Sequence, residues 1–179
     1  MTMGEYNENT ASSDMVEAQQ VEVRPSKCKG FIGEYSHTLD SKGRVIIPAR
    51  FRDELGERFV VSKGMGVQGK GKCLFAYSIE EFDKVQDGLN EMPMFDPYSI
   101  TMRNHFRGSA SEVDVDKQGR ACIPPRLRQY ANIGDSTTFV GDGPRIIIWD
   151  SAEWERQNAV DDELIFDAVA AKYAEGFKL

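Results

Sequence analysis

The stretch Asp40-Ser-Lys-Gly-Arg-Val-Ile-Ile-Pro-Ala-Arg-Phe-Arg52 recurs without a gap as Asp116-Lys-Gln-Gly-Arg-Ala-Cys-Ile-Pro-Pro-Arg-Leu-Arg128. The two segments are identical at seven of thirteen positions and share the pattern D-x-x-G-R-x-x-I-P-x-R-[FL]-R. Internal self-similarity of this kind is the sequence signature of a duplicated structural unit. The 179-residue chain is therefore predicted to contain two copies of one module.

The segments that follow the two copies also correspond. Leu74–Tyr77 matches Ile146–Trp149, and each apolar stretch runs into a helix start with an acid three residues after the N-cap. These starts are a capping box and its aspartate variant, Ser78-x-x-Glu81 and Asp150-x-x-Glu153. Phe82 and Trp154 then occupy the same position on the two helices. The matched endings show that the duplication is real.

Each copy predicts a turn, a strand and a short helix. The aspartate of D-x-x-G can accept backbone hydrogen bonds, and the glycine tolerates positive φ. A proline without an N–H group ends the pairing of the next strand and suits the first turn of a helix. The rules give a strand Arg44–Ile47 and a helix Ala49–Leu55 closed by Gly56. The structural turn residues are Asp40, Gly43 and Pro48 in the first copy, and Asp116, Gly119 and Pro124 in the second.

The rest of the chain divides by composition and periodicity. The predicted units are a disordered acidic tail (1–30), a first repeat (34–81), a helical linker (82–109), a second repeat (110–153) and a C-terminal helix (154–179). The linker is read as two helices. Apolar residues from Ile79 to Met92 mark one face of the first. The second follows the N-cap pair Asp96-Pro97, carries Tyr98, Met102 and Phe106 in one row, and ends at Gly108.

The net charge of −7 is unevenly distributed. Residues 1–24 hold five acids and one base, and residues 150–179 hold eight acids and three bases. The two copies reverse this balance, each with four bases and one acid. Their basic residues are Lys42, Arg44, Arg50 and Arg52 in the first copy, and Lys117, Arg120, Arg126 and Arg128 in the second. Because charge acts over a Debye length of roughly 8–10 Å, the acidic total is compatible with an anionic partner.

An arginine directly after a turn glycine is suited to nucleic acid. The guanidinium group offers five donors in a rigid fork that matches phosphate oxygens and the O6 and N7 atoms of guanine. A two-stranded β element can enter the major groove of DNA. The alternative reading is that these arginines are solvated, or pair with acids such as Asp40 and Asp53.

The D-x-x-G-R-x-x-I-P segment resembles the core of the AbrB/SpoVT-type swapped-hairpin domain, a bacterial DNA-binding module. Two copies separated by helices resemble the MraZ family in particular, over about Phe31 to Trp154. The resemblance implies an α+β fold in which two interleaved AbrB-like β-hairpin repeats form one double-psi or swapped-hairpin barrel with flanking helices. One chain then supplies both hairpins, whereas single-copy relatives need two chains.

The resemblance also implies a function. It implies a transcriptional regulator that binds direct repeats in double-stranded promoter DNA, as a ring-shaped homo-oligomer, often at its own division and cell-wall gene cluster. By position, the DNA-facing arginines fall on Arg44 and Arg120, and the basic residues of the following turn on Arg52 and Arg128. Lys42, Lys117, Arg50 and Arg126 are added on local charge alone. The acidic tail departs from the family pattern, as does Gln118, which stands at the position of Lys42.

The sequence leaves two other functions open. Gly64-Met-Gly-Val-Gln-Gly69 is a literal G-x-G-x-x-G, which would suit a nucleotide-binding enzyme, but a predicted strand follows it where a dinucleotide site needs a helix. A hairpin loop is the better interpretation. The other candidate is a protein-interaction scaffold that uses the acidic tail and helices and does not bind DNA.

Little else in the sequence points to chemistry. His37 and His105 are not spaced for a metal site, and the chain shows no nucleophile motif. We therefore expect no catalytic residues, no metal and no small-molecule cofactor. Cys28, Cys73 and Cys122 are read as separate reduced thiols. Because there is no run of about 20 apolar residues and no signal-peptide core, we expect a cytoplasmic, nucleoid-associated protein without a membrane partner.

Overall fold

The computed structural model describes residues 30–65 and 71–158, and within them the fold is α+β. The predicted acidic tail except Gly30, most of the glycine-rich loop and most of the C-terminal helix lie outside the described residues. The elements in chain order are β1 (Glu34–Thr38), β2 (Arg44–Ile46), α1 (Ala49–Leu55), β3 (Arg58–Met65), β4 (Lys72–Ser78), α2 (Ile79–Glu91), α3 (Pro97–Phe106), β5 (Ser111–Asp114), β6 (Arg120–Cys122), α4 (Pro125–Tyr130), β7 (Ser136–Asp142) and β8 (Arg145–Asp150). Residues 151–158 are helical as well.

The strands of the two repeats interleave. Six strands form one antiparallel sheet in the order β1-β7-β8-β4-β3-β5, and β2 pairs with β6 in a separate two-stranded ribbon. Exchanging the repeats converts β1 into β5, β2 into β6, β3 into β7 and β4 into β8, and this exchange maps the sheet order onto its own reverse. Each repeat therefore completes the sheet of the other, with β1 beside β7 and β5 beside β3.

The register places equivalent residues opposite each other at the centre of both sheets. Val45 pairs with Ala121 in the ribbon, and these residues occupy the same position in the repeated motif. Phe75 pairs with Ile147 in the large sheet, where β4 meets β8, and these two are also equivalent. A pseudo-two-fold axis thus relates the repeats and runs through both sheets.

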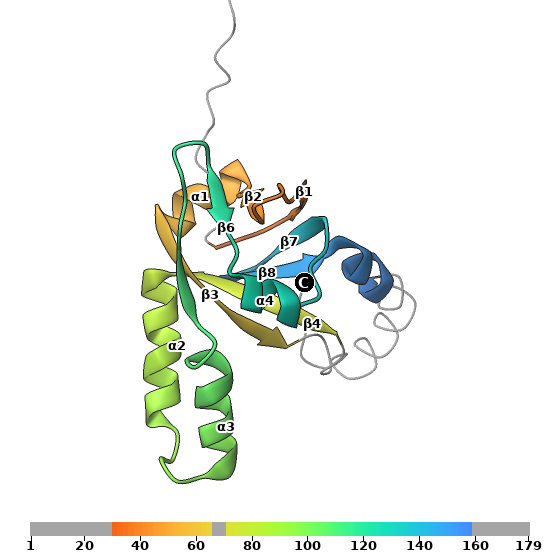
Figure 1. Cartoon of the computed structure of the whole chain (residues 1–179). Coiled ribbons are helices and arrows are strands. Elements are labelled where there is room, and N and C mark those ends of the chain that lie inside the picture. The colour runs from red at the N-terminus through yellow and green to blue at the C-terminus, as the bar shows by residue number, and fades with distance from the viewer. Residues whose placement is uncertain (1–29, 66–70, 159–179) are drawn as a thin grey trace, which may run out of the picture.

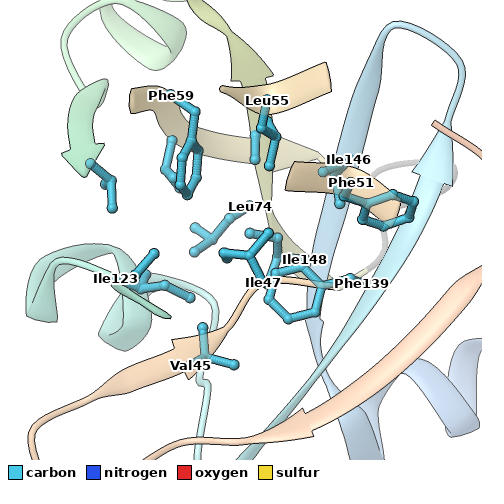
Figure 2. Close-up of a cluster of buried hydrophobic side chains, with 14 of the residues drawn as sticks. Val45, Ile47, Phe51, Leu55, Phe59, Leu74, Ile123, Phe139, Ile146 and Ile148 are labelled. Carbon is cyan, nitrogen blue, oxygen red and sulfur yellow. The ribbon is translucent and has the colours of Figure 1, made fainter. Parts of the chain in front are cut away.

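One core lies between the large sheet and the ribbon with its short helices. The ribbon contributes Val45 and Ala121, α1 contributes Phe51, and the strands of the large sheet contribute their facing side chains. Figure 2 shows how side chains from both repeats converge in this cluster, with Val45 and Ile123 on the ribbon side and Phe139 from β7. Because both repeats fill the same core, neither repeat could bury its apolar face alone.

A second core covers the opposite face of the large sheet. Phe82 and Leu89 of α2 and Phe106 of α3 pack there with Phe75 and Trp149. Apolar layers on both faces explain why Cys73–Tyr77 of β4 is buried at every residue and does not alternate. The ribbon and the α2–α3 hairpin consequently lie on opposite sides of the sheet, and the hairpin extends away from the body (Figure 1).

Most of the predicted local structure is confirmed. Helix α1 has the predicted bounds and ends at Gly56 with a φ of 77°. The hydroxyl of Ser78 accepts the N–H of Glu81 at 3.3 Å, and the matching bond from Glu153 to Asp150 is 3.2 Å. Trp154, the counterpart of Phe82, packs against the same second core.

One detail of the linker prediction is wrong. The sequence predicts Tyr98 in the apolar row of α3, but its side chain is 82% exposed, because the first turn of α3 lies at the tip of the projecting hairpin, where no element among the described residues covers it. The end of the second helix is as predicted: α3 runs to Phe106, Arg107 is its C-cap, and Gly108 follows directly.

The glycine-rich segment connects two paired strands. Strand β3 runs to Met65, β4 starts at Lys72, and these two residues pair in the antiparallel register. The strand predicted after the G-x-G-x-x-G segment is therefore confirmed, while residues 66–70 lie outside the described residues. Among the helices within 30–65 and 71–158, none is long and apolar enough to cross a membrane.

Candidate nucleic-acid interface

The predicted D-x-x-G turns are confirmed and have the same geometry in both repeats. In the first, Oδ1 of Asp40 accepts hydrogen bonds from the backbone N–H groups of Lys42 and Arg44, both at 2.9 Å. Gly43 has a φ of 74°, which glycine adopts without steric cost, and its N–H donates to the carbonyl of Asp40 at 2.8 Å. The same bonds recur in the second turn between Asp116 and the N–H groups of Gln118, Gly119 and Arg120.

The aspartate that starts each turn also holds the arginine after the turn glycine. Nε and Nη2 of Arg44 lie 2.7 and 2.6 Å from Oδ2 of Asp40. The corresponding distances from Arg120 to Asp116 are 2.9 and 2.8 Å. The pairing engages two of the three guanidinium nitrogens, so Nη1 is left to meet a second acceptor. The side chains of Arg44 and Arg120 remain 32% and 28% exposed.

This pairing changes the acidity of the turn. The hydrogen bond from the Arg44 side chain, reinforced by backbone N–H groups, lowers the pKa of Asp40 from 3.8 to about 2. Arg120 lowers the pKa of Asp116 to about 2 in the same way. Both turn aspartates therefore stay ionised at neutral pH beside their arginines.

Replacing both turn aspartates, as Asp40→Asn with Asp116→Asn, is expected to make the stability of the fold depend less on pH in the acidic range. A carboxylate whose folded-state pKa lies below its ordinary value stabilises the fold fully above that ordinary value. The contribution is lost as the pH falls from about 4 to about 2, where both carboxylates become protonated. Thermal melting across this interval should show a steeper fall of Tm for the wild type than for the double variant. Parallel curves would contradict the assignment, and added salt should reduce the difference because the pairs are partly exposed.

Arg52 and Arg128 lie against the turn glycine of the opposite repeat. A Cβ atom on Gly43 would collide with the guanidinium group of Arg128, and one on Gly119 with that of Arg52. Nε of Arg128 donates to the carbonyl of Ile123 at 3.1 Å. Both arginines are half-buried, and both glycines are buried beneath them. These two arginines therefore have a contact within the protein, and their contact with DNA stays a prediction.

The other predicted basic residues are exposed and lie on the turns or on the short helices: Lys42, Lys117, Arg50 and Arg126. Positions two apart on a helix point roughly 200° apart. Arg126 therefore projects from a different side of α4 than Arg128, and its Nη2 donates to the carbonyl of Ser109 at 3.3 Å. The same spacing separates Arg50 from Arg52 on α1. The turn residues thus lie close to Arg52 and Arg128, whereas Arg50 and Arg126 project from other sides of α1 and α4.

The outward face of the ribbon also includes two residues outside the predicted DNA-binding set. Val45 and Ala121 are 1% exposed and point into the core. Because side chains alternate along a strand, their neighbours point outward, and these neighbours are Arg44, Ile46, Arg120 and Cys122. Ile46 and Cys122 fall on variable positions of the repeated motif, so only the alternation around the buried pair could have indicated them.

Comparison with known proteins agrees with the duplicated architecture. The family described as "MraZ protein" matches the chain twice, over residues 31–104 and 106–175. A protein of Alkaliphilus oremlandii named "Transcriptional regulator MraZ" is 43% identical over 145 residues, which cover 81% of this chain and 97% of the relative. Relatives with the same name from Acetivibrio thermocellus and Desulforamulus reducens are 40% and 43% identical over 80% and 72% of this chain, and these matches cover 96% and 87% of the relatives.

Proposed function

The chain belongs to the MraZ family, and from this premise we propose that it is a transcriptional regulator that binds double-stranded promoter DNA. The shared name of the relatives supports the regulatory role. One observation carries the DNA-binding part of the proposal. The two repeats present the same aspartate-held arginine, Arg44 and Arg120, on adjacent strands of one ribbon.

The ribbon has the shape and the donors that the major groove requires. That groove is about 12 Å wide and admits a two-stranded β ribbon. Arg44 and Arg120 keep N–H donors beyond those that the aspartates accept, and a guanidinium fork matches O6 and N7 of guanine. Because each arginine is already held by its aspartate, it loses less rotamer freedom on binding. Lys42 and Lys117, exposed in the turns, supply positive charge toward the phosphate backbone.

The proposal includes the arrangement of the repeats. We assign the two sheets and their shared core to one swapped-hairpin (double-psi) barrel, built from repeats 34–81 and 110–153 and connected by the linker 82–109. The reciprocal pairing of β1 with β7 and of β5 with β3 supports this assignment. In such a barrel a single chain presents both arginine turns on one surface.

The proposal extends to assembly and target. The family resemblance implies a ring-shaped homo-oligomer on direct repeats upstream of a division and cell-wall gene cluster, in the cytoplasm at the nucleoid. The tip of the α2–α3 hairpin offers a surface for self-association, because Met94, Phe95 and Tyr98 are 71%, 87% and 82% exposed. Contiguous exposed apolar residues often mark protein contacts. Analytical ultracentrifugation of the full-length protein measures the assembly.

Footprinting on the chain's own upstream DNA tests the function. We expect the full-length protein to protect several short, evenly spaced sites in one orientation. We also expect the logarithm of the affinity to fall with the logarithm of the salt concentration, by a slope of roughly 0.9 for each neutralised phosphate. A scrambled duplex of the same composition is the control. Equal affinity for both duplexes, with no discrete protected site, would contradict the proposal.

A further inference from the structure

The outward face of the β2–β6 ribbon is made of two facing pairs. Arg44 lies opposite Cys122, and Ile46 lies opposite Arg120. Opposed residues on antiparallel strands have Cβ atoms about 4.5–5.5 Å apart, so the four side chains form one compact patch. The two arginines occupy one diagonal of this patch, and Ile46 and Cys122 occupy the other.

The pseudo-two-fold axis relates identical residues on one diagonal and different residues on the other. Exchange of the repeats carries Arg44 onto Arg120, which is the same residue type. It carries Ile46 onto Cys122, which is smaller and chemically different. A patch with true two-fold symmetry would read a two-fold symmetric site, whereas this patch distinguishes its two ends. The two turns also differ, because Gln118 stands where the first turn has Lys42.

Ile46 has the chemistry to read one base. Its side chain is 48% exposed and lies opposite Arg120 on the ribbon. The apolar group that a base pair presents in the major groove is the C5-methyl of thymine, and desolvating an aliphatic side chain against it is favourable. Cys122 behaves differently, because its Sγ lies 3.7 Å from the carbonyl of Lys42 and is directed toward the turn of the other repeat.

We propose that Ile46 is a specificity-determining residue that contacts the C5-methyl group of a thymine, and that its difference from Cys122 sets the direction in which the ribbon reads DNA. This inference rests on the proposed DNA binding and deepens it. Direct repeats require such a direction, since every copy of the site has the same orientation.

A methyl-deletion scan tests the contact with full-length protein. Thymines in one footprinted site are replaced singly by 2′-deoxyuridine, which removes only the C5-methyl group. We expect one position at which the replacement weakens wild-type binding about fourfold, the value of one buried methyl group. The Ile46→Ala variant should be insensitive at that position. Ile100→Ala, which removes a 42% exposed isoleucine from α3, should keep the wild-type sensitivity.

A second variant tests the direction. Cys122→Ile gives both ends of the patch the same residues. We compare the affinity for the footprinted site with that for a symmetrised site, in which the half read by Ile46 is repeated with two-fold symmetry. The variant is expected to shift the ratio of these two affinities about fourfold in favour of the symmetrised site.

The outcomes separate this inference from the proposed function. If no thymine position affects wild-type binding, or if Ile46→Ala shows the same sensitivity as the wild type, the inference is wrong although salt-dependent binding stands. An unchanged ratio for Cys122→Ile overturns the directional part. If the protein binds no DNA at low salt, the proposed function and this inference fall together.

Discussion

Replacing Arg44 and Arg120 together with alanine is expected to weaken binding to the specific site by at least about 30-fold. Each arginine that reads a base contributes about 1–3 kcal/mol of discrimination, so losing two removes about 2–6 kcal/mol. The change also leaves the carboxylates of Asp40 and Asp116 without their partners on the ribbon, where they would repel phosphate groups. Fluorescence anisotropy with a labelled site at constant salt measures the loss.

Two controls separate recognition from charge. Arg44→Lys with Arg120→Lys keeps both charges but removes the planar fork, so preference for the specific site should fall while non-specific binding persists. Arg107→Ala removes one positive charge from the α2–α3 hairpin, where this arginine bonds Gln86 and Asn90, and should bind as the wild type does. If the double alanine variant also binds like wild type, the ribbon is not the DNA-binding surface.

Phe51→Ala is expected to lower the free energy of unfolding by about 3–5 kcal/mol, the usual cost of truncating a buried phenylalanine. The Phe51 ring is fully buried and makes edge-to-face contacts with Phe31 and Tyr35, with ring centroids 5.4 and 5.1 Å apart. Figure 2 shows this ring in the cluster that joins α1 to the large sheet. Urea unfolding measures the change as a lower midpoint at an unchanged slope.

The matched control is Phe95→Ala at the tip of the α2–α3 hairpin. Its ring is 87% exposed, so the same substitution should change the stability of the protomer by no more than about 0.5 kcal/mol. Equal losses for the two variants would mean that the contacts of Phe51 do not hold α1 in place. Because α1 also carries Arg52, which covers Gly119, Phe51→Ala should weaken DNA binding as a secondary effect.

Local chemistry made much of the secondary structure predictable. Helix α1 begins after Pro48 and ends before Gly56 as predicted, because a proline and a positive-φ glycine act on the residues beside them. The Asp96-Pro97 start of α3 is confirmed for the same reason, with Asp96 accepting the N–H of Ser99 at 2.7 Å. The exposure of Tyr98 was not predictable, since helical periodicity does not reveal whether another element covers a row of side chains.

The candidate site was likewise predictable only where its geometry depends on residues close together in the sequence. The motif alone located both turns and the arginines after their glycines, because an aspartate side chain reaches only the next few backbone N–H groups. It did not show that Arg128 covers Gly43 or that Ile46 faces outward opposite Arg120. Those contacts join residues of different repeats, and no local rule specifies their partners.

The sequence by itself determined the duplication, the turn geometry, the bounds of α1, the start of α3 and the segregation of positive charge into the two motifs. Only the tertiary structure decided that β1 pairs with β7, that β2 pairs with β6, and that the two arginine turns share one ribbon. Hydrogen bonding and φ preferences act over a few residues and can be read from the chain. The choice of partner strand follows from burial, because each repeat has an apolar face that becomes a closed core only when the other repeat covers it.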